Sequence, residues 1–418
     1  MYLRVFSRAE KGVMYMYENV KEYLEWARKK VDEEIPKLAD ELKETFLLDV
    51  EDVFRGGKRF RPSLTLLVAQ AIAGKDAWKD AIDYALAIEM IHSFSLNVDD
   101  ILDMDTIRRG RPSEWVVHGL LPAFLTGIGG ITQAFSLGSK NHKAMQVLNE
   151  TIQAMASGAV KEMITGNVFK RDFLLNIIVL KTGALMATAT QMGAIAVGAP
   201  SYVEEAFRKY GLNVGIAYQM QDDLNDIIVS IRDGEPKGDL RDHRLTLPLY
   251  IIHNSVPSLA TVIDLFLNRK ISFKNFADKF LTAGGLDLFG KVNDEIENYI
   301  GKAIHSIKDL ELQEEYKEIL TDLPYYMIDA MRKEALEKWR KPLKKVEIEE
   351  EEATEMESLS YNDWIKTLPP TLIAATSLLQ MNLSDEDIIE KTGITDKELE
   401  YLKEMLKKYG MLGGKRGD

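Results

Sequence analysis

The feature that most constrains the fold is an aspartate pattern, DDxxD, that occurs twice within apolar helical segments. It occurs first as Asp99, Asp100 and Asp103, and again as Asp222, Asp223 and Asp226. Residues four apart on a helix lie on one face, so each pattern can aim carboxylates at one point. Crowded carboxylates repel each other unless a cation lies between them. The repeat therefore predicts two helices facing each other across a cavity that holds divalent ions and an anionic ligand.

The residues after the first pattern indicate what that anion is. Hard oxygen ligands suit Mg2+, which takes one or two carboxylates and fills its other positions with substrate phosphates and water. Arg108 and Arg109 follow within a few residues and carry forked donors that grip phosphate oxygens. Acid, metal and base in one segment suggest a bound diphosphate. In a chain with 66 acidic residues, the alternative for one such pattern alone is a solvated helix face.

Composition limits the class of protein. The chain has 418 residues, of which 28% are charged and 46% are apolar, enough for one large core and a small appendage. A net charge of −13 argues against nucleic acid as the main partner, and the lack of cysteine excludes disulfides. The charged N-terminus has no apolar signal core, and we expect no window of about 18 uncharged apolar residues. A soluble cytoplasmic protein is predicted.

A second group of candidate residues is basic. Gly56 and Gly57 allow close backbone approach, and Lys58 and Arg61 then lie at a helix start, where N–H groups favour an anion. The alternative is a basic helix start without a ligand. A polar loop at 230–250 resembles binding loops in its charge and length.

Two residues precede the first aspartate pattern on its own predicted helix, 78–105. His92 lies about two turns before Asp99 and shares its face, so it can donate to phosphate or be an ordinary core histidine. Phe94 would lie deeper in any cavity that the carboxylates cap, and the alternative is core packing.

The remaining pattern is helical throughout. No alternating runs of strand length recur, so the body is predicted to be all-α. We expect helices at 15–48, broken at Pro36, at 144–165 and at 176–199, with 114–140 irregular at first. Lys181 and Gly183 interrupt the apolar helix 176–199. A buried ammonium needs a partner, unless the lysine snorkels to the surface, and the glycine favours a kink that frees backbone carbonyls.

The C-terminal part differs in character. Seven glutamates between 347 and 357 predict an acidic linker at 341–360, which separates residues 1–340 from a small helical domain at 361–418. Ser384 is a predicted N-cap, and Thr395 with Glu398 forms a capping box. The rhythm is that of a helix-turn-helix, but its acidic second helix suits DNA poorly, so we favour a packing or partner-binding domain of unknown role.

In sum, the motifs resemble those of a known family, the trans-isoprenyl diphosphate synthases or polyprenyl synthetases, over about residues 20–340. They are GGKRFRP (56–62), EMIHSFSLNVDDILDMDTIRRGRP (89–112), KTG (181–183), YQMQDDLNDI (218–227) and DLRDHRLTLP (239–248). The resemblance implies an all-α isoprenoid-synthase bundle, a homodimer, and head-to-tail 1′-4 condensation of isopentenyl diphosphate with an allylic diphosphate.

The resemblance also implies a role for each matched residue. The Mg2+ ligands, for three ions per active site, would be Asp99, Asp100, Asp103, Asp222, Asp223 and Asp226. The allylic diphosphate would be held by Arg108, Lys181, Lys237 and Arg244. Isopentenyl diphosphate would be held by Lys58, Arg61, His92 and Arg109. Thr182 and Gln219 would face the allylic cation.

Product length and departures from the family pattern follow from the same comparison. Phe94, with Ile91 one turn deeper, would form the floor of the product tunnel, which favours a geranylgeranyl (C20) product with farnesyl (C15) second. This chain has Gly158-Ala159 and Glu162 where the family usually has Gly-Gln followed by aspartate. Arg244 replaces a lysine, and His243 replaces a glycine.

Two rival functions are open. A class I terpene cyclase would usually carry an Asn/Ser/Glu triad in place of Asp222–Asp226 and would not need Lys58, Arg61 and His92. A weakly active or regulatory subunit of a heteromeric synthase is motivated by the substituted positions and the extra domain. Both intact aspartate patterns argue against the second rival.

Overall fold

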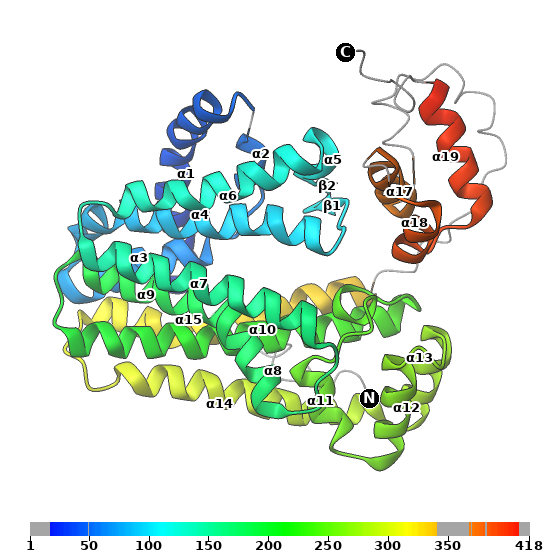
Figure 1. Cartoon of the computed structure of the whole chain (residues 1–418). Coiled ribbons are helices and arrows are strands. Elements are labelled where there is room, and N and C mark those ends of the chain that lie inside the picture. Colours follow the sequence, from blue (N-terminus) through cyan, green and yellow to red (C-terminus); the bar gives the residue numbers. More distant parts are fainter. Residues whose placement is uncertain (1–16, 49, 341–367, 369, 381–382, 409–418) are drawn as a thin grey trace. The chain divides into compact units, whose positions relative to one another are not determined.

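The computed structural model describes residues 17–48, 50–340, 368, 370–380 and 383–408, and these are helical with few exceptions (Figure 1). The all-α prediction is confirmed. A two-stranded hairpin, absent from the prediction, pairs β1 (Ile107–Arg108) with β2 (Arg111–Pro112) in antiparallel register. The predicted linker 341–360 and the start of the predicted C-terminal domain, 361–367, lie outside the described residues.

The described residues form two compact units. The first contains residues 17–38, 58–90 and 133–340, and the second contains the described residues of 39–57, 91–132 and beyond 367. Three helices contribute residues to both units, namely α1 (Glu18–Phe46), α4 (Trp78–Leu102) and α6 (Leu120–Gly138).

The first unit is built from helices arranged around α10, which packs directly on α8, α9, α11, α14 and α15. Its other α-helices are α3 (Phe60–Ala73), α7 (His142–Thr165), α8 (Arg171–Ile178), α9 (Ala184–Ala196), α10 (Ser201–Asp233), α11 (Leu247–His253), α12 (Pro257–Leu267), α13 (Phe273–Thr282), α14 (Phe289–Ile307) and α15 (Glu314–Arg340). Short 3-10 turns lie at Lys75–Ala77, Gly238–Leu240 and Gly285–Leu288.

Helix α10 forms the centre of this unit because it packs against α9, α14 and α15. Its apolar positions, among them Met220 and Leu224, are buried in the core with residues from α11 to α15. A side chain at Gly211 would bring its Cβ to 2.3 Å from the Met186 carbonyl oxygen, so glycine is what allows α10 to lie this close to α9.

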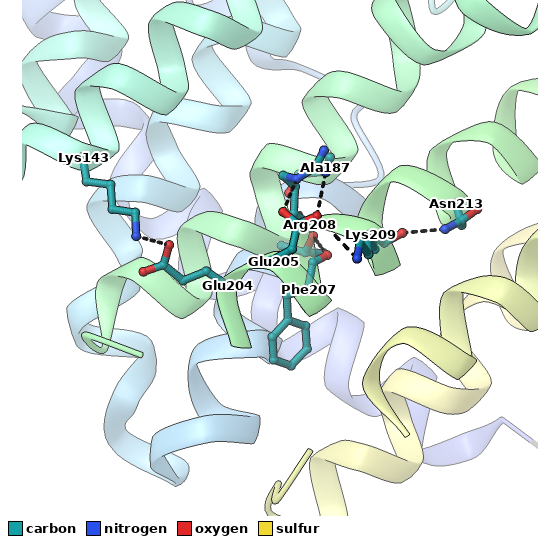
Figure 2. Close-up of polar contacts among 9 residues, drawn as sticks. Lys143, Ala187, Glu204, Glu205, Phe207, Arg208, Lys209 and Asn213 are labelled. Atoms are coloured by element: carbon teal, nitrogen blue, oxygen red, sulfur yellow. Dashed lines mark hydrogen bonds and ion pairs between the residues drawn. The ribbon is translucent and has the colours of Figure 1, made fainter. Parts of the chain in front are cut away.

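Polar contacts fix the first half of α10 (Figure 2). Glu204 forms an ion pair with Lys143 of α7, with 2.5 Å between the Lys143 Nζ and the Glu204 Oε2. The Thr190 hydroxyl of α9 donates to the Phe207 carbonyl at 2.6 Å, a buried bond between α9 and α10. Glu205 and Arg208 form a two-pronged pair within the helix. These contacts set the register of α10 against its neighbours and so position the aspartates further along it.

Three expectations about the helices are wrong. Helix α1 runs through Pro36 without a break, and its buried apolar side chains on either side, such as Ile35 and Leu38, outweigh the lost hydrogen bond. Residues 114–140 are helical from Glu114, as α5 (Glu114–His118) and then α6. The third wrong expectation is that no long uncharged apolar window occurs. Two stretches, Leu120–Gly138 and Arg171–Ala196, are long and apolar enough to cross a membrane by length and composition, although buried core helices pass the same test.

The second unit contains the short helices α2 (Glu51–Phe54) and α5, the hairpin, and three C-terminal helices. The last three are α17 (Pro370–Gln380), α18 (Asp385–Thr392) and α19 (Asp396–Lys408), with a core of their own. The predicted caps are confirmed. Ser384 accepts from the Asp387 N–H at 3.2 Å, and the Thr395 N–H donates to Glu398 at 2.7 Å.

Candidate active site

The second aspartate pattern, residues 222–226, lies in the second half of α10. Asp223 is buried, Asp226 is half-buried, and Asp222 is exposed. Helical spacing explains this arrangement, because residues one apart point in directions about 100° from each other. Asp222 and Asp226, four apart, share a face as the sequence predicted.

A chain of hydrogen bonds joins Asp223 to the KTG segment. The Gln219 amide N–H donates to Asp223 Oδ1 at 2.7 Å, and the Thr182 hydroxyl donates to Gln219 Oε1 at 2.6 Å. Because the hydroxyl proton is engaged by Gln219, the Thr182 oxygen has lone pairs available for an electron-poor group. The structure thus brings together Thr182 and Gln219, which the resemblance implies would face the allylic cation, and Asp223, one of the predicted metal ligands.

The KTG segment is a π-helical turn, Val179–Gly183, between α8 and α9. Such turns are rare and widen the helix locally, which agrees with the predicted interruption at Gly183. Gly183 faces Gly215 of α10, where an added Cβ would lie 2.9 Å from the Gly183 Cα. The half-exposed Lys181 ammonium lies 2.5 Å from Glu162 of α7, so the partner predicted for a lysine in this helix is present.

These residues line a cavity of about 380 Å³ within the first unit. Lys181, Thr182, Gln219 and Asp223 lie on its wall, and the polar loop after α10 contributes further lining residues, Asp239, Asp242, His243 and Arg244. Arg244 lies 3.7 Å from Asp239 and 3.5 Å from Asp242. Lys237 instead forms an ion pair with Asp233 and is absent from the lining residues.

The carboxylates of the second aspartate pattern, of which Asp223 lies on the cavity wall, are held in an unfavourable environment. Loss of water raises the pKa of Asp223 well above its usual range, and the nearby Asp239 adds to the effect. Loss of water and then the neighbouring Asp222 raise the pKa of Asp226 to about 7. The pKa of Asp222 is also raised by loss of water, while Lys58 and Arg61 oppose the shift. Carboxylates crowded in this way are suited to a divalent cation.

The basic residues of the segment 56–61 have different partners in the structure. Lys58 pairs with Glu334 at 3.0 Å, and Arg61 lies in the electrostatic range of Asp222, where burial lowers the arginine pKa. Arg59 between them is buried and pairs with Glu89 at 2.5 Å. Lys58 and Arg61 thus accompany the second aspartate pattern, whereas Arg59 ties α3 to α4.

The first aspartate pattern lies at the end of α4 in the second unit. Asp99 and Asp103 are half-buried, and the Asp103 N–H donates to the Asp99 carbonyl at 2.8 Å, so the helical turn continues past Leu102. Asp100 is buried and accepts from Arg108 Nε at 2.6 Å. Burial raises the pKa of Asp100, and the bond from Arg108 opposes the shift.

Arg109 lies on the tight turn of the hairpin and is held by backbone. Its guanidinium donates to the Arg55 carbonyl at 2.7 Å, and its side chain lies against Gly56. Arg108 and Arg109 line a small cavity of about 70 Å³ within the second unit, together with Asp100 and Asn97.

The predicted tunnel-floor residues are fully enclosed. Phe94 and Ile91 are 0% and 1% exposed. The Phe94 ring packs edge-to-face on Phe54 at 5.6 Å between centroids, and an added Cβ at Gly130 would lie 2.2 Å from the ring. His92, two positions before Phe94 on α4, is half-buried.

The donor set fits a magnesium ion that shares its ligands with a substrate. Among the residues that the structure describes, no group of three or more histidine or acidic side chains could hold a metal ion unaided. Mg2+ typically takes few carboxylates and completes its shell with substrate phosphates and water. The paired carboxylates within each pattern, Asp99 with Asp103 and Asp222 with Asp226, are ligands of that kind.

Sequence reasoning missed several lining residues. Asp239 begins the motif 239–248 but had no predicted role, and in the structure its charge helps to raise the pKa of Asp223 and of Asp226. Asn167 fixes the loop by donating to the His243 carbonyl at 2.8 Å and accepting from the Leu245 N–H at 2.7 Å. Asn167 belongs to no pattern that could have identified it from sequence, and the motif that begins at Asp239 gave that residue no role.

Comparison with known structures defines the class of fold. A geranylgeranyl pyrophosphate synthetase from Pyrococcus horikoshii is similar, with a TM-score of 0.62, 26% identity, and coverage of 75% of this chain and 98% of that one. A polyprenyl synthase from Caulobacter crescentus, complexed with calcium and isoprenyl diphosphate, has a TM-score of 0.61, 24% identity, and coverage of 74% and 97%. The chain has the all-α isoprenyl synthase fold.

Sequence comparison then defines the family. The model for polyprenyl synthetase matches residues 45–275. A geranylfarnesyl diphosphate synthase from Aeropyrum pernix is 33% identical over 301 residues, which are 66% of this chain and 91% of that protein. The chain belongs to the polyprenyl synthetase family and is a prenyltransferase, a short-chain trans-prenyl diphosphate synthase. Similar relatives are named as farnesyl, geranylgeranyl and solanesyl synthases, so their names leave the product length open.

Proposed function

We propose that the chain condenses isopentenyl diphosphate with an allylic diphosphate, 1′-4 and head to tail, to give geranylgeranyl or farnesyl diphosphate. The observation that carries this proposal is the chain of hydrogen bonds from Asp223 through Gln219 to Thr182 on the wall of the cavity. It unites anionic metal ligands with neutral oxygens in one pocket, which is what ionisation of an allylic diphosphate requires.

The residues would act in the following roles. Arg108, Lys181 and Arg244 bind the allylic diphosphate, with Lys237 in support, while Lys58, Arg61, His92 and Arg109 bind isopentenyl diphosphate. The aspartates would hold Mg2+, three ions per site, and the bound metal would supply the positive charge that stabilises the diphosphate as a leaving group. Thr182 and Gln219 direct oxygen lone pairs at the positive charge on the allylic carbon. The allylic C1–O bond breaks, C4 of isopentenyl diphosphate forms the new bond to that carbon, and the released diphosphate takes the proton that C2 loses as the new double bond forms.

The product length is proposed from the position of Phe94. Its ring is enclosed by Phe54 and α6, so a growing chain that reached it would meet a rigid aromatic wall. This favours C20, with C15 second.

The proposal includes a cytoplasmic homodimer. Support comes from α6, where Leu121, Leu125 and Ile128 are 66%, 63% and 43% exposed on one face of the helix. A stripe of large apolar side chains in water marks an interaction surface. Light scattering of the purified protein, compared with Leu125→Glu, tests it: a monomeric wild type refutes the dimer.

A product assay tests the reaction. Purified protein receives labelled isopentenyl diphosphate, Mg2+ and, in turn, the C5, C10 and C15 allylic diphosphates, and the dephosphorylated products are sized by chromatography. We expect one C20 or C15 alcohol, lost in Asp99→Ala and in Asp222→Ala but retained in Asp278→Asn, which changes an exposed acid on α13. No condensation with any primer would refute the synthase.

A weakly active or regulatory subunit is the second candidate. The observation favouring it is the ion pair that Glu162 makes with Lys181, because a paired ammonium binds a diphosphate less well. The same assay decides, since this candidate predicts no product from the chain alone.

A further inference from the structure

The C-terminal helices α17, α18 and α19, residues 370–408, are the part of the chain that the proposed reaction does not use. The family match ends at residue 275, and the similar structures cover about three quarters of this chain while being themselves almost fully covered. We call these three helices the C-terminal module.

One helix of the module is buried on more sides than its own partners can cover. In α17, the side chains of Leu372, Ala375, Leu378 and Leu379 pack in the core shared with α18 and α19. Ala374, on the same helix, is 5% exposed but belongs to a different cluster, with Trp115 and Ala123. A helix apolar all round is normally buried on all sides, so α17 has a second docking surface.

That second surface lies at the end of the first aspartate pattern. The cluster around Trp115 includes Ile101 and Met104, which flank Asp103. Met104 also packs against the core of the module, so it joins the two clusters. Its φ of 54° lies in the left-handed region, which a side chain like methionine adopts only when its surroundings enforce it.

Hydrogen bonds connect this cluster to the aspartates themselves. The Trp115 indole N–H donates to the Asp105 carbonyl at 2.7 Å, and the Asp105 N–H donates to the Asp100 carbonyl at 2.8 Å. Trp115 is 1% exposed, with Ala374 among its neighbours. The segment between Asp103 and Asp105 is therefore fixed by Trp115 on one side and by Met104 against α17 on the other.

We propose that the C-terminal module is an intramolecular clamp on residues 103–105, docked through Ala374 on Trp115, and that this clamp raises the affinity of the first aspartate pattern for a divalent metal ion. The inference rests on the proposed function in one respect, that Asp99 and Asp103 bind metal. Groups that hold metal ligands in position commonly change metal affinity by about tenfold to a hundredfold when removed.

Cross-linking tests the docking in the full chain. The chain has no cysteine, so Ala123→Cys with Ala374→Cys gives a unique pair for a short bismaleimide. The control pair is Ala123→Cys with Glu400→Cys, at an exposed position of α19. We expect an intramolecular cross-link in the first pair and little in the control. Equal reaction of both pairs, or a cross-link between two chains, would overturn the docking.

Metal binding tests the consequence without relying on turnover. Ala374→Arg places a long charged side chain in the cluster, and Glu400→Gln is a control with the same change in net charge. Every protein compared carries Asp222→Ala and Asp226→Ala, which remove ligands of the second aspartate pattern, and binding of Mn2+ is measured by the electron paramagnetic resonance signal of the free ion. We expect the apparent Kd to rise about tenfold in Ala374→Arg and to stay unchanged in Glu400→Gln.

A second variant guards against a module that fails to fold. Trp115→Phe keeps an aromatic ring in the cluster but removes the indole donor to Asp105, and it should weaken Mn2+ binding in the same direction with unchanged circular dichroism. Unchanged Mn2+ binding in both Ala374→Arg and Trp115→Phe would overturn the clamp. Failure of the proposed reaction would appear separately, as a wild type that binds Mn2+ but makes no prenyl product.

Discussion

Replacing Asp226 with asparagine should stabilise the metal-free protein while removing a proposed metal ligand. Loss of water, followed by the charges of Asp222 and Asp239, raises the pKa of Asp226 to about 7 from an ordinary value of 3.8. One pKa unit corresponds to about 1.4 kcal/mol, so the ionised side chain destabilises the folded state by up to about 4 kcal/mol. Asparagine has nearly the same shape without the charge.

The destabilisation by the ionised Asp226 side chain grows as pH rises. Below pH 3.8 the carboxyl group is protonated in the folded and the unfolded chain, and it has no effect. Between that pH and about 7 the unfolded chain loses the proton first, so the free energy of unfolding falls as pH rises. Above pH 7 the penalty is complete. The advantage of Asp226→Asn should therefore grow from about 1.7 kcal/mol at pH 5 to about 4 kcal/mol at pH 8.

Urea unfolding in the presence of a chelator at pH 5 and pH 8 measures this difference. Asp278→Asn is the matched control, because it changes an exposed acid on α13 and should leave the free energy of unfolding unaltered. Added Mg2+ should stabilise the wild type more than Asp226→Asn. An Asp226→Asn protein that is no more stable than the wild type at pH 8, or whose advantage does not change with pH, refutes the argument.

Three further predictions concern other contacts. Glu89→Ala removes one of the two carboxylates that pair with the buried Arg59 guanidinium, leaving Asp32 at 2.9 Å, and should lower the free energy of unfolding by about 2–3 kcal/mol in urea titrations. Phe94→Ala should shift the products to longer chains, seen by chromatography of the dephosphorylated alcohols, since the aromatic wall is removed. Glu162→Gln removes the charge that pairs with Lys181 and should lower the KM for the allylic diphosphate by up to about fivefold, or about 1 kcal/mol, in initial-rate assays.

Local patterns in the sequence predicted the helices well where one cause dominates. The caps at Ser384 and Thr395 depend on residues three apart, and both form as expected. The break expected at Pro36 does not occur, because the decision rests on tertiary burial of the residues around it, which a local rule cannot weigh.

The site was predictable to the extent that helical spacing determines it. Gln219 and Asp223 meet because they lie one helical turn apart on α10. Thr182 reaches Gln219 because the π-helical turn that carries Thr182 packs against α10. The loop residues Asp239 and Asn167 could not be inferred, since the path of a loop depends on contacts with distant segments.

The two aspartate patterns have the same residue spacing, but the charges around their buried middle aspartates differ. In the first, the buried middle residue, Asp100, is neutralised by Arg108 from the adjoining hairpin. In the second, the buried middle residue, Asp223, accepts from the neutral amide of Gln219, and the nearby Asp239 raises its pKa further. A charge that its own chain already balances needs no added cation, whereas the α10 carboxylates do. The second pattern therefore gains more from a bound divalent ion, and the first depends more on how its neighbours hold Asp99 and Asp103 in place.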